Sequence, residues 1–112
     1  VSRACRDGAI DDVIELRDRG YQSLVEEGGG NFSGGQCQRL EIARALVGEP
    51  TIVILDEATN ALDEDTQNRV LKNIYSEMEN ETVISVSHDK NSLKYCKKVF
   101  SVSKNDLEEI IL

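Results

Sequence analysis

Hydrophobic residues recur at helical spacing in the segment that follows Ser33. Ser33 and Gln36 form the sequence pattern of a capping box, in which two side chains satisfy backbone groups at the start of a helix. The apolar positions that follow are Leu40, Ala43, Leu46 and Val47. Gly48 and Pro50 then supply a stop. The pattern predicts a helix over residues 34–47.

A second helical stripe covers residues 64–78. Its apolar positions are Val70, Leu71, Ile74, Tyr75 and Met78. Asp63 precedes the stripe as a helix cap, and Glu64 and Asp65 are placed favourably against the helix dipole. We therefore predict a helix that begins after Asp63.

Two short runs rich in β-branched residues flank this second helix. Residues 51–55 read Thr-Ile-Val-Ile-Leu, and residues 82–86 read Thr-Val-Ile-Ser-Val. The first run is unbroken, which predicts a strand buried on both faces, as in a parallel sheet. Strand, helix and strand at this spacing predict a βαβ unit with a right-handed crossover. The predicted fold class is therefore α/β.

The rest of the chain predicts smaller elements. In residues 1–30 we expect short helices and a loop, with Asp11 capping a turn that Gly20 ends. The three glycines at 28–30 are expected to interrupt regular structure. The elements expected after His88 are a short helix over 91–95, a strand over 98–102 and a turn at 105–106.

The composition is that of a soluble globular chain with one hydrophobic core. Hydrophobic residues make up 39% of the 112 positions and charged residues 30%. The net charge of −8 argues against a nucleic-acid-binding surface, because phosphate contacts need clustered Lys and Arg. The three cysteines form no metal or disulfide pattern, which favours a reduced compartment. No apolar run approaches the roughly 20 residues that span a bilayer.

Polar groups follow both predicted strands directly. Asp56 and Glu57 follow the first strand, and Ser87 and His88 follow the second. Ligands of open parallel sheets bind beside the carboxyl ends of the strands, so these groups are expected to converge. Phosphoryl transfer with Mg²⁺ uses such parts: a carboxylate for the metal, a group that orients water and a donor for the phosphate. Taken singly, however, an acidic pair is common loop chemistry, and a lone histidine is more often structural.

Four segments, taken in order, resemble the motifs of ABC-type ATPases. Residues 31–36 (Asn-Phe-Ser-Gly-Gly-Gln) resemble the LSGGQ signature with Phe32 in place of the usual Leu, and the match continues through residue 46. Residues 52–57 resemble a Walker B strand with its adjoining glutamate, and residues 60–63 resemble the D-loop. His88 stands at the position of the switch histidine. Together the four motifs are far more specific than any one of them.

The resemblance implies a role for each matched residue. Asp56 would hold Mg²⁺ through water, and Glu57 would act on the attacking water as general base or orienting group. His88 would contact the γ-phosphate of ATP. Ser33, Gly34 and Gly35 would reach the γ-phosphate of a second ATP, held by the opposite subunit, with Gln36 nearby. Asp63 would lie at the dimer interface.

Elementary chemistry bears on two of these roles. A helix N-terminus with glycines presents free N–H groups and a positive dipole end, and it lets a phosphate approach the backbone closely. Ser33 also has a purely structural explanation as part of the capping box, and both explanations can hold together. For Asp63 a plain helix cap is an equally good explanation.

The resemblance also predicts how the chain is organised. Residues 1–47 would be part of a helical subdomain with the signature motif, and residues 48–112 the C-terminal part of a RecA-like core. The resemblance thus implies a P-loop NTPase fold. The fold would be partial, because the sequence has no G-x-x-x-x-G-K-[ST] motif. We therefore expect a fragment that does not bind ATP tightly or hydrolyse it alone. Apolar sheet edges are expected to be exposed.

The function that the resemblance implies is ATP-driven export at the cytoplasmic face of a membrane, with ATP and Mg²⁺ as cofactors. The expected partners are a second ATP-binding domain in a head-to-tail dimer and a transmembrane domain, but no nucleic acid. The sequence Glu57-Ala58-Thr59 resembles that of exporters, and residues 39–42 are similar to those of exporters of peptides and bacteriocins. The alternatives are a soluble ABC-type ATPase acting on DNA or ribosomes and a truncated interaction module without catalysis.

The sequence departs from the family pattern in two places. Cys37 stands where the signature more often has a basic residue. Asp89 and Lys90 follow His88, where exporters commonly have Arg-Leu. The second departure leaves the expected role of His88 in place but makes the subfamily less certain.

Overall fold

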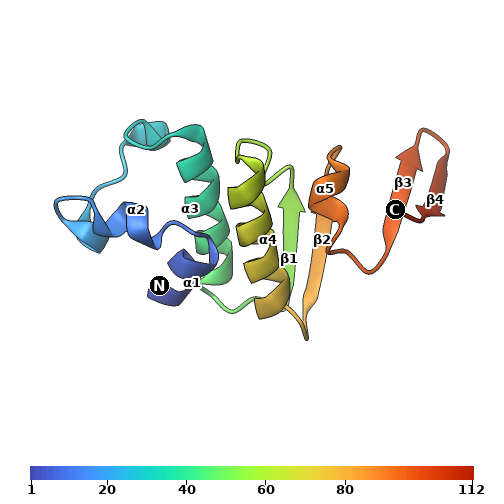
Figure 1. The fold of residues 1–112 in the computed structure, drawn as a ribbon, viewed down its shortest axis with the longest axis horizontal. Coiled ribbons are helices and arrows are strands. Elements are labelled where there is room, and N and C mark those ends of the chain that lie inside the picture. The colour runs from blue at the N-terminus through green and yellow to red at the C-terminus, as the bar shows by residue number, and fades with distance from the viewer.

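Helices and strands alternate along most of the chain. The structure, a computed structural model, describes residues 1–112. Its elements in chain order are α1 (Ser2–Asp7), α2 (Asp11–Glu15), η1 (Gly20–Gln22), η2 (Glu27–Gly29), α3 (Gly34–Leu46), β1 (Ile52–Asp56), α4 (Glu64–Glu77), β2 (Thr82–Val86), α5 (Lys90–Leu93), β3 (Val99–Ser103) and β4 (Asp106–Ile110). They form an elongated body of 50 × 28 × 23 Å (Figure 1). The predicted α/β class is confirmed.

β1 and β2 form a parallel pair, with α4 between them in the chain. The register aligns Ile52 with Thr82 and Asp56 with Val86. Both strands therefore end at the same edge of the sheet. Figure 1 shows this edge at the top, together with the starts of α3 and α4. The predicted βαβ unit is confirmed, and it brings the residues after Asp56 close to those after Val86.

Both long helices begin where their caps predict. Ser33 Oγ accepts a hydrogen bond from the Gln36 N–H at 3.1 Å, and the Gln36 side chain accepts one from the Ser33 N–H at 3.0 Å. The Asp63 carboxylate accepts from the Thr66 N–H at 2.7 Å at the start of α4. These caps satisfy backbone donors that would otherwise lack partners.

The N-terminal segment differs from the prediction. Asp11 is the first residue of α2 and not its cap, because Ile10 holds the cap position without a side-chain hydrogen bond. Ile10 is fully buried, so packing of its side chain sets the start of this helix. α2 ends at Glu15, and Gly20, with a φ of 51°, begins the 3-10 turn η1.

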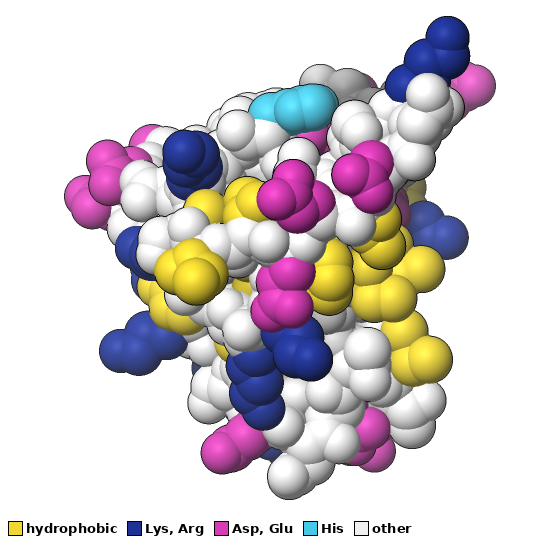
Figure 2. Space-filling model, turned by 90° about the vertical axis from the view of Figure 1, so that its right-hand side faces the viewer, with side chains coloured by type: hydrophobic (Ala, Val, Ile, Leu, Met, Phe, Trp, Pro, Cys, Tyr) yellow, Lys and Arg dark blue, Asp and Glu magenta, His cyan; other side chains and the backbone are white.

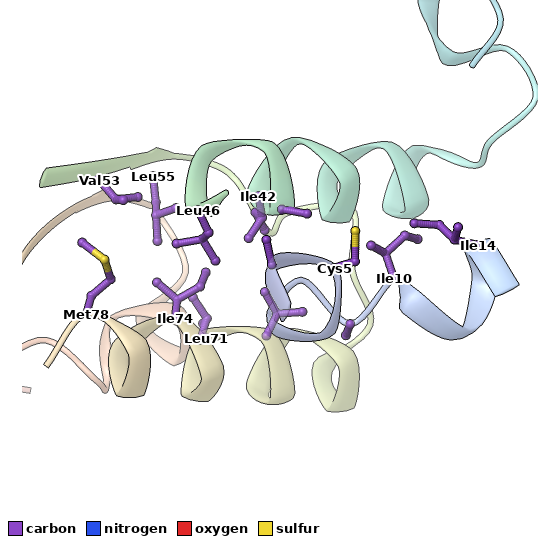
Figure 3. Packing of buried hydrophobic residues seen from close by; sticks show 14 residues of the cluster. Cys5, Ile10, Ile14, Ile42, Leu46, Val53, Leu55, Leu71, Ile74 and Met78 are labelled. Atoms are coloured by element: carbon purple, nitrogen blue, oxygen red, sulfur yellow. The ribbon is translucent and has the colours of Figure 1, made fainter. Parts of the chain in front are cut away.

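The hydrophobic core lies between α1, α3, α4 and one face of β1. Figure 3 shows α1 between the two long helices, and Leu55 pointing toward Leu46 and Ile74. The fully buried large side chains are Ile10, Val70, Leu71 and Ile74. Burying a side chain of this size stabilises a fold by roughly 1.5–3 kcal/mol. Residues 1–47 and residues 48–112 both contribute to this one core. The predicted division of the chain between them stays a prediction.

The prediction that β1 is buried on both faces is wrong. Val53 and Leu55 are 4% and 5% exposed, whereas Ile52 and Ile54 are 59% and 67% exposed. The sheet has two strands, and the core helices cover one of its faces. On the other face Ile54 lies beside Ile84 of β2, which is also exposed.

The C-terminal segments lie close to their predicted positions. α5 begins one residue before the predicted helix, and β3 begins one residue after the start of the predicted strand. β3 and β4 pair antiparallel, with Val99 opposite Ile110, in a hairpin without buried residues. The hairpin projects from the end of the molecule opposite α2 (Figure 1). None of the helices combines the length and the apolar character that a membrane span requires.

Candidate functional site

The loop that leaves β1 begins with a strained residue. Glu57 has a left-handed backbone conformation, with a φ of 49°. For a residue with a side chain this conformation costs about 1–2 kcal/mol, so neighbouring contacts must hold it. The Glu57 N–H donates to the carbonyl of Val86 at 2.9 Å. The Glu57 carbonyl accepts from Gln38 Nε2 at 3.3 Å. Glu57 is therefore held between the end of β2 and α3.

The side chains of Glu57 and His88 meet beside this bend. His88 Nε2 lies 3.7 Å from Glu57 Oε1, which is too long for a hydrogen bond. Glu57 Oε1 is buried and has no hydrogen-bond partner. The His88 side chain is fully exposed, and Figure 2 shows it in cyan at the upper surface of the molecule. A buried polar atom without a partner costs about 1–3 kcal/mol, so the geometry fits a water or a polar ligand at Glu57 Oε1.

Asp56 stands next to this pair at the end of β1. Its side chain is exposed, and its backbone is in register with Val86. No three His, Cys, Asp or Glu side chains gather closely enough to hold a metal ion by themselves. Mg²⁺ is usually held by one or two carboxylates and completes its shell with water and phosphate oxygens. An exposed Asp56, followed in the chain by Glu57 with its unpartnered oxygen, fits that mode of binding.

A second polar site lies at the N-terminus of α3. Ser33 Oγ accepts from Gln36, which leaves the Ser33 hydroxyl proton free to donate. The N–H groups of Gly34 and Gly35 open the helix, so no carbonyl of the helix itself can accept from them. A Cβ on Gly34 would meet no atom within 4 Å. Donors and open space at a positive helix end suit an anion.

The start of α3 is packed against the loop that follows β1. A Cβ at Gly35 would lie 3.1 Å from the carbonyl oxygen of Ala61 and 3.3 Å from Leu62 Cδ2. A side chain at position 35 would therefore press on the backbone of the following loop, whether or not a ligand approaches. The structure brings the side chains of Glu57 and His88 together at the strand ends, with Asp56 next to Glu57 in the chain, and it keeps Ser33 and Gln36 in a separate capping box.

Comparison with known proteins identifies the family. The sequence matches the ABC transporter family over residues 6–60. It is 41% identical over 102 residues to the leukotoxin export ATP-binding protein LtxB of Aggregatibacter actinomycetemcomitans. It is 40% identical over 102 residues to the alpha-hemolysin translocation ATP-binding protein HlyB of Proteus vulgaris. This chain belongs to the ABC transporter family.

The family relatives are much longer than this chain. Each of these two alignments covers 91% of the chain but 14% of the relative's own length. The fold is similar to that of a bacterial Atm1-family ABC exporter with ATP bound, with a TM-score of 0.78 and 37% sequence identity. That likeness covers 82% of this chain and 16% of the exporter chain. The predicted partial ABC ATPase fold is confirmed.

Gln38 links the two parts of the ABC site, a role that sequence reasoning missed. Gln38 Nε2 donates to the Glu57 carbonyl and to Asn60 Oδ1, while Gln38 Oε1 accepts from the Ala61 N–H at 2.9 Å. Both ends of this amide are therefore used to join the signature helix to the loop after the Walker B strand. The only sequence signal was its position in the signature match.

The unusual phenylalanine of the signature also has a partner. The Arg17 guanidinium lies 3.9 Å from the centre of the Phe32 ring, a cation–π contact. Arg17 Nη2 donates to the Asn31 carbonyl at 2.6 Å. The Asn31 side chain accepts from the Glu26 N–H and donates to the Leu24 carbonyl. These contacts fix both sides of the glycine run at 28–30, which precedes the signature.

The partly buried side chain of Cys37 packs against the glycine run. Its thiol donates to the carbonyl of Gly29 at 3.6 Å, and a Cβ on Gly29 would lie 2.7 Å from the sulfur. The departure from the family pattern at position 37 is thus accompanied by close packing of the glycine run against α3.

Asp63 acts as a helix cap in this structure. Hydrogen bonding from Thr66, first from its side chain and then from its N–H, lowers the pKa of the Asp63 carboxyl below its usual value of 3.8. Its expected place at a dimer interface stays a prediction. A cavity of about 330 Å³ lies away from these residues, between the N-terminus and the C-terminal ends of α3 and α4.

Proposed function

We propose that this chain supplies the water-activating and partner-sensing residues of an ATP-hydrolysing domain in an ABC exporter. One observation carries the proposal: Glu57 Oε1 is buried without a hydrogen-bond partner and faces His88 Nε2 across 3.7 Å. A carboxylate oxygen held in this way can accept a proton from a water molecule. The family match, which includes ATP-binding proteins of export systems, supports ATP as the substrate.

The residues at the strand ends would divide the work of hydrolysis. Asp56 would hold Mg²⁺ through water, and the ion would neutralise charge that develops on the phosphates. Glu57 would orient the attacking water and take its proton. His88 would donate a hydrogen bond to the γ-phosphate. The left-handed bend at Glu57 supports this division, because its N–H donates to the Val86 carbonyl of β2 and its carbonyl accepts from the Gln38 side chain of α3.

The signature residues would serve a different ATP molecule. We propose that Ser33, Gly34 and Gly35, with Gln36 nearby, bind the γ-phosphate of ATP held by a second ATP-binding domain arranged head to tail. The hydrogen bonds of the Ser33 side chain and N–H stay within the capping box and do not reach Glu57 or His88. Asp63, at the end of the loop between β1 and α4, would face the partner domain while it caps α4.

Export at the cytoplasmic face of a membrane is the transport process that we propose. The relatives named above are export and translocation proteins, and the Aspergillus fumigatus multidrug transporter mdr4 is 38% identical over 102 residues. These names favour a transmembrane domain as partner over the alternative of a soluble ATPase acting on DNA or ribosomes. Transmembrane segments encoded in the complete gene would support export, and their absence from the gene and its neighbours would favour the soluble alternative.

Hydrolysis by the complete protein, expressed from its intact gene, tests the catalytic assignment. We expect Mg²⁺-dependent ATP hydrolysis that Glu57→Gln lowers at least about 100-fold, because a general base contributes that much. ATP binding should persist in the variant, because the amide keeps the shape of the side chain. The rate per molecule should rise with protein concentration, since each site uses the signature of a partner. A wild-type protein that hydrolyses no ATP, or a Glu57→Gln variant with full activity, would contradict the proposal.

A further inference from the structure

One buried amide ties the loop that carries Glu57 to the loop that carries His88. Gln67 of α4 is only 6% exposed. Its Nε2 donates to Thr59 Oγ1 at 3.0 Å and to Asp89 Oδ2 at 3.3 Å. Thr59, also 6% exposed, lies two residues after Glu57, and Asp89 follows His88 directly.

The turn after His88 depends on Asp89 for its shape. The Asp89 N–H donates to Ser87 Oγ at 3.0 Å, and Asp89 Oδ1 accepts from the Asn91 N–H at 2.9 Å, which caps α5. These two bonds are internal to the turn. The bond from Gln67 joins the turn to the interior of the molecule. A second link to α4, from Asn91 Nδ2 to Glu64 Oε1 at 3.1 Å, is between exposed side chains, where a single hydrogen bond contributes less.

We infer that Gln67 is a positioning residue, which sets the place of His88 relative to Glu57. The inference rests on the proposed function. Gln67 touches neither reacting group and acts through Thr59 and Asp89. The fully exposed His88 side chain has no packing of its own to fix it, so its place follows from the turn that carries it. A misplacement of about 1 Å in a catalytic group can lower a rate about 100-fold.

The hydrogen bond between these residues has a fixed direction, from the Gln67 amide to the Asp89 carboxylate, which makes the contact testable. Glutamate at position 67 would set a carboxylate against the carboxylate of Asp89, and like charges repel. Asparagine at position 89 would need its one oxygen both for the α5 cap and for Gln67. Changing both residues reverses the contact: the new amide at position 89 would donate to the new carboxylate at position 67 and keep its own oxygen for the cap. Thr59 can follow, because its hydroxyl can donate as well as accept.

Steady-state ATP hydrolysis by the complete protein is the first measurement. We expect Gln67→Glu to lower kcat about tenfold or more, with KM for ATP changed less than about twofold, because positioning acts on the reaction and not on binding. Asp89→Asn should lower kcat less than Gln67→Glu does. The double variant Gln67→Glu/Asp89→Asn should recover most of the wild-type kcat. Gln22→Glu, which makes the same chemical change at an exposed position, is the matched control and should leave kcat unchanged.

NMR spectra of the 112-residue chain give a readout without ATP, because His88 is its only histidine. The imidazole Cε1–Hε1 signal should shift in Gln67→Glu and return toward the wild-type position in the double variant. In Gln22→Glu it should stay unchanged. Thermal unfolding of each variant reports whether it folds. If Gln67→Glu does not fold, Asp89→Asn and the double variant decide, since Asp89 is exposed.

The two proposals fail in different ways. If the wild type hydrolyses ATP and Gln67→Glu keeps its kcat, Gln67 has no positioning role and the proposed function stands. If kcat falls in both single variants and stays low in the double variant, the contact with Asp89 is not the cause. If the wild type hydrolyses no ATP, the proposed function fails, and the inference about catalysis fails with it. The histidine signal then still reports whether Gln67 fixes the turn.

Discussion

The two faces of the β1–β2 sheet come from the same apolar runs but have opposite surroundings. On one face Val53 and Leu55 are almost fully buried against the core helices. On the other face Ile54 and its neighbour Ile84 are exposed over about half or more of their surface, at 67% and 49%. Side chains of similar size and polarity therefore differ in burial because of what lies on each side of the sheet, and not because of the residues themselves.

This difference separates two contributions of one strand. The covered face supplies apolar burial, which is the main stabilising term of the fold. The bare face contributes little burial, yet it keeps the β-branched side chains that favour extended backbone. The candidate site lies at the end of both faces, because Asp56 and Glu57 stand at the end of β1. The comparison predicts that neighbouring residues in β1 differ strongly in their effect on stability.

The largest effect is expected on the covered face. Leu55→Ala should lower the free energy of unfolding by about 2–5 kcal/mol, because it removes buried methyl groups and leaves a cavity. Ile54→Ala, one residue away on the bare face, should lower it by about 1 kcal/mol or less. Urea unfolding of the chain, followed by circular dichroism, measures both. Equal losses for the two variants would show that the bare face is covered in solution.

A smaller effect is expected at the cap of α4, the helix that covers the sheet. Asp63→Ala should destabilise the chain, and Asp63→Asn should not at neutral pH, because asparagine caps a helix about as well as aspartate. The pKa of Asp63 is lowered in the folded state, so the folded chain binds fewer protons there than the unfolded chain. Its contribution is fully present above the usual pKa of 3.8 and is lost as the pH falls through the lower folded value.

Unfolding measurements of wild type and Asp63→Asn between neutral pH and pH values below that usual pKa test this sign. The stability of the wild type relative to Asp63→Asn should fall as the solution becomes acidic. A difference that stays constant with pH would mean that the hydrogen bond to Thr66 does not distinguish the folded from the unfolded chain.

The elements that could be predicted from the sequence are those with local causes. α3 and α4 begin at Ser33 and Asp63 because capping and apolar spacing act within a few residues. The parallel pairing of β1 and β2 follows from the length of the connection between them. The start of α2 could not be predicted, because burial of Ile10 against distant parts of the chain decides it. The bare face of β1 could not be predicted either, since burial depends on the layers around a strand.

The candidate site shows the same limit. The positions of Asp56, Glu57 and His88 at the strand ends could be predicted from the strand pattern, whereas their roles stay a prediction. Gln38 and Gln67 could not, because their partners lie far away in the sequence, such as Asn60 for Gln38 and Asp89 for Gln67. A glutamine in a helix has no sequence pattern that reveals such a partner. The supporting contacts of a site thus require the fold, whereas its reacting groups do not.

The smallest effect on stability is expected from a polar change on the bare face of the β1–β2 sheet. Ile54→Thr keeps a β-branched side chain, so the free energy of unfolding should change by less than about 1 kcal/mol. The variant removes apolar surface next to Ile84, so self-association of the chain should decrease. Sedimentation velocity at increasing concentration measures this, with Leu55→Thr as the matched change on the covered face. If Ile54→Thr destabilised the chain as strongly as Leu55→Thr, the bare face would be part of the packed core.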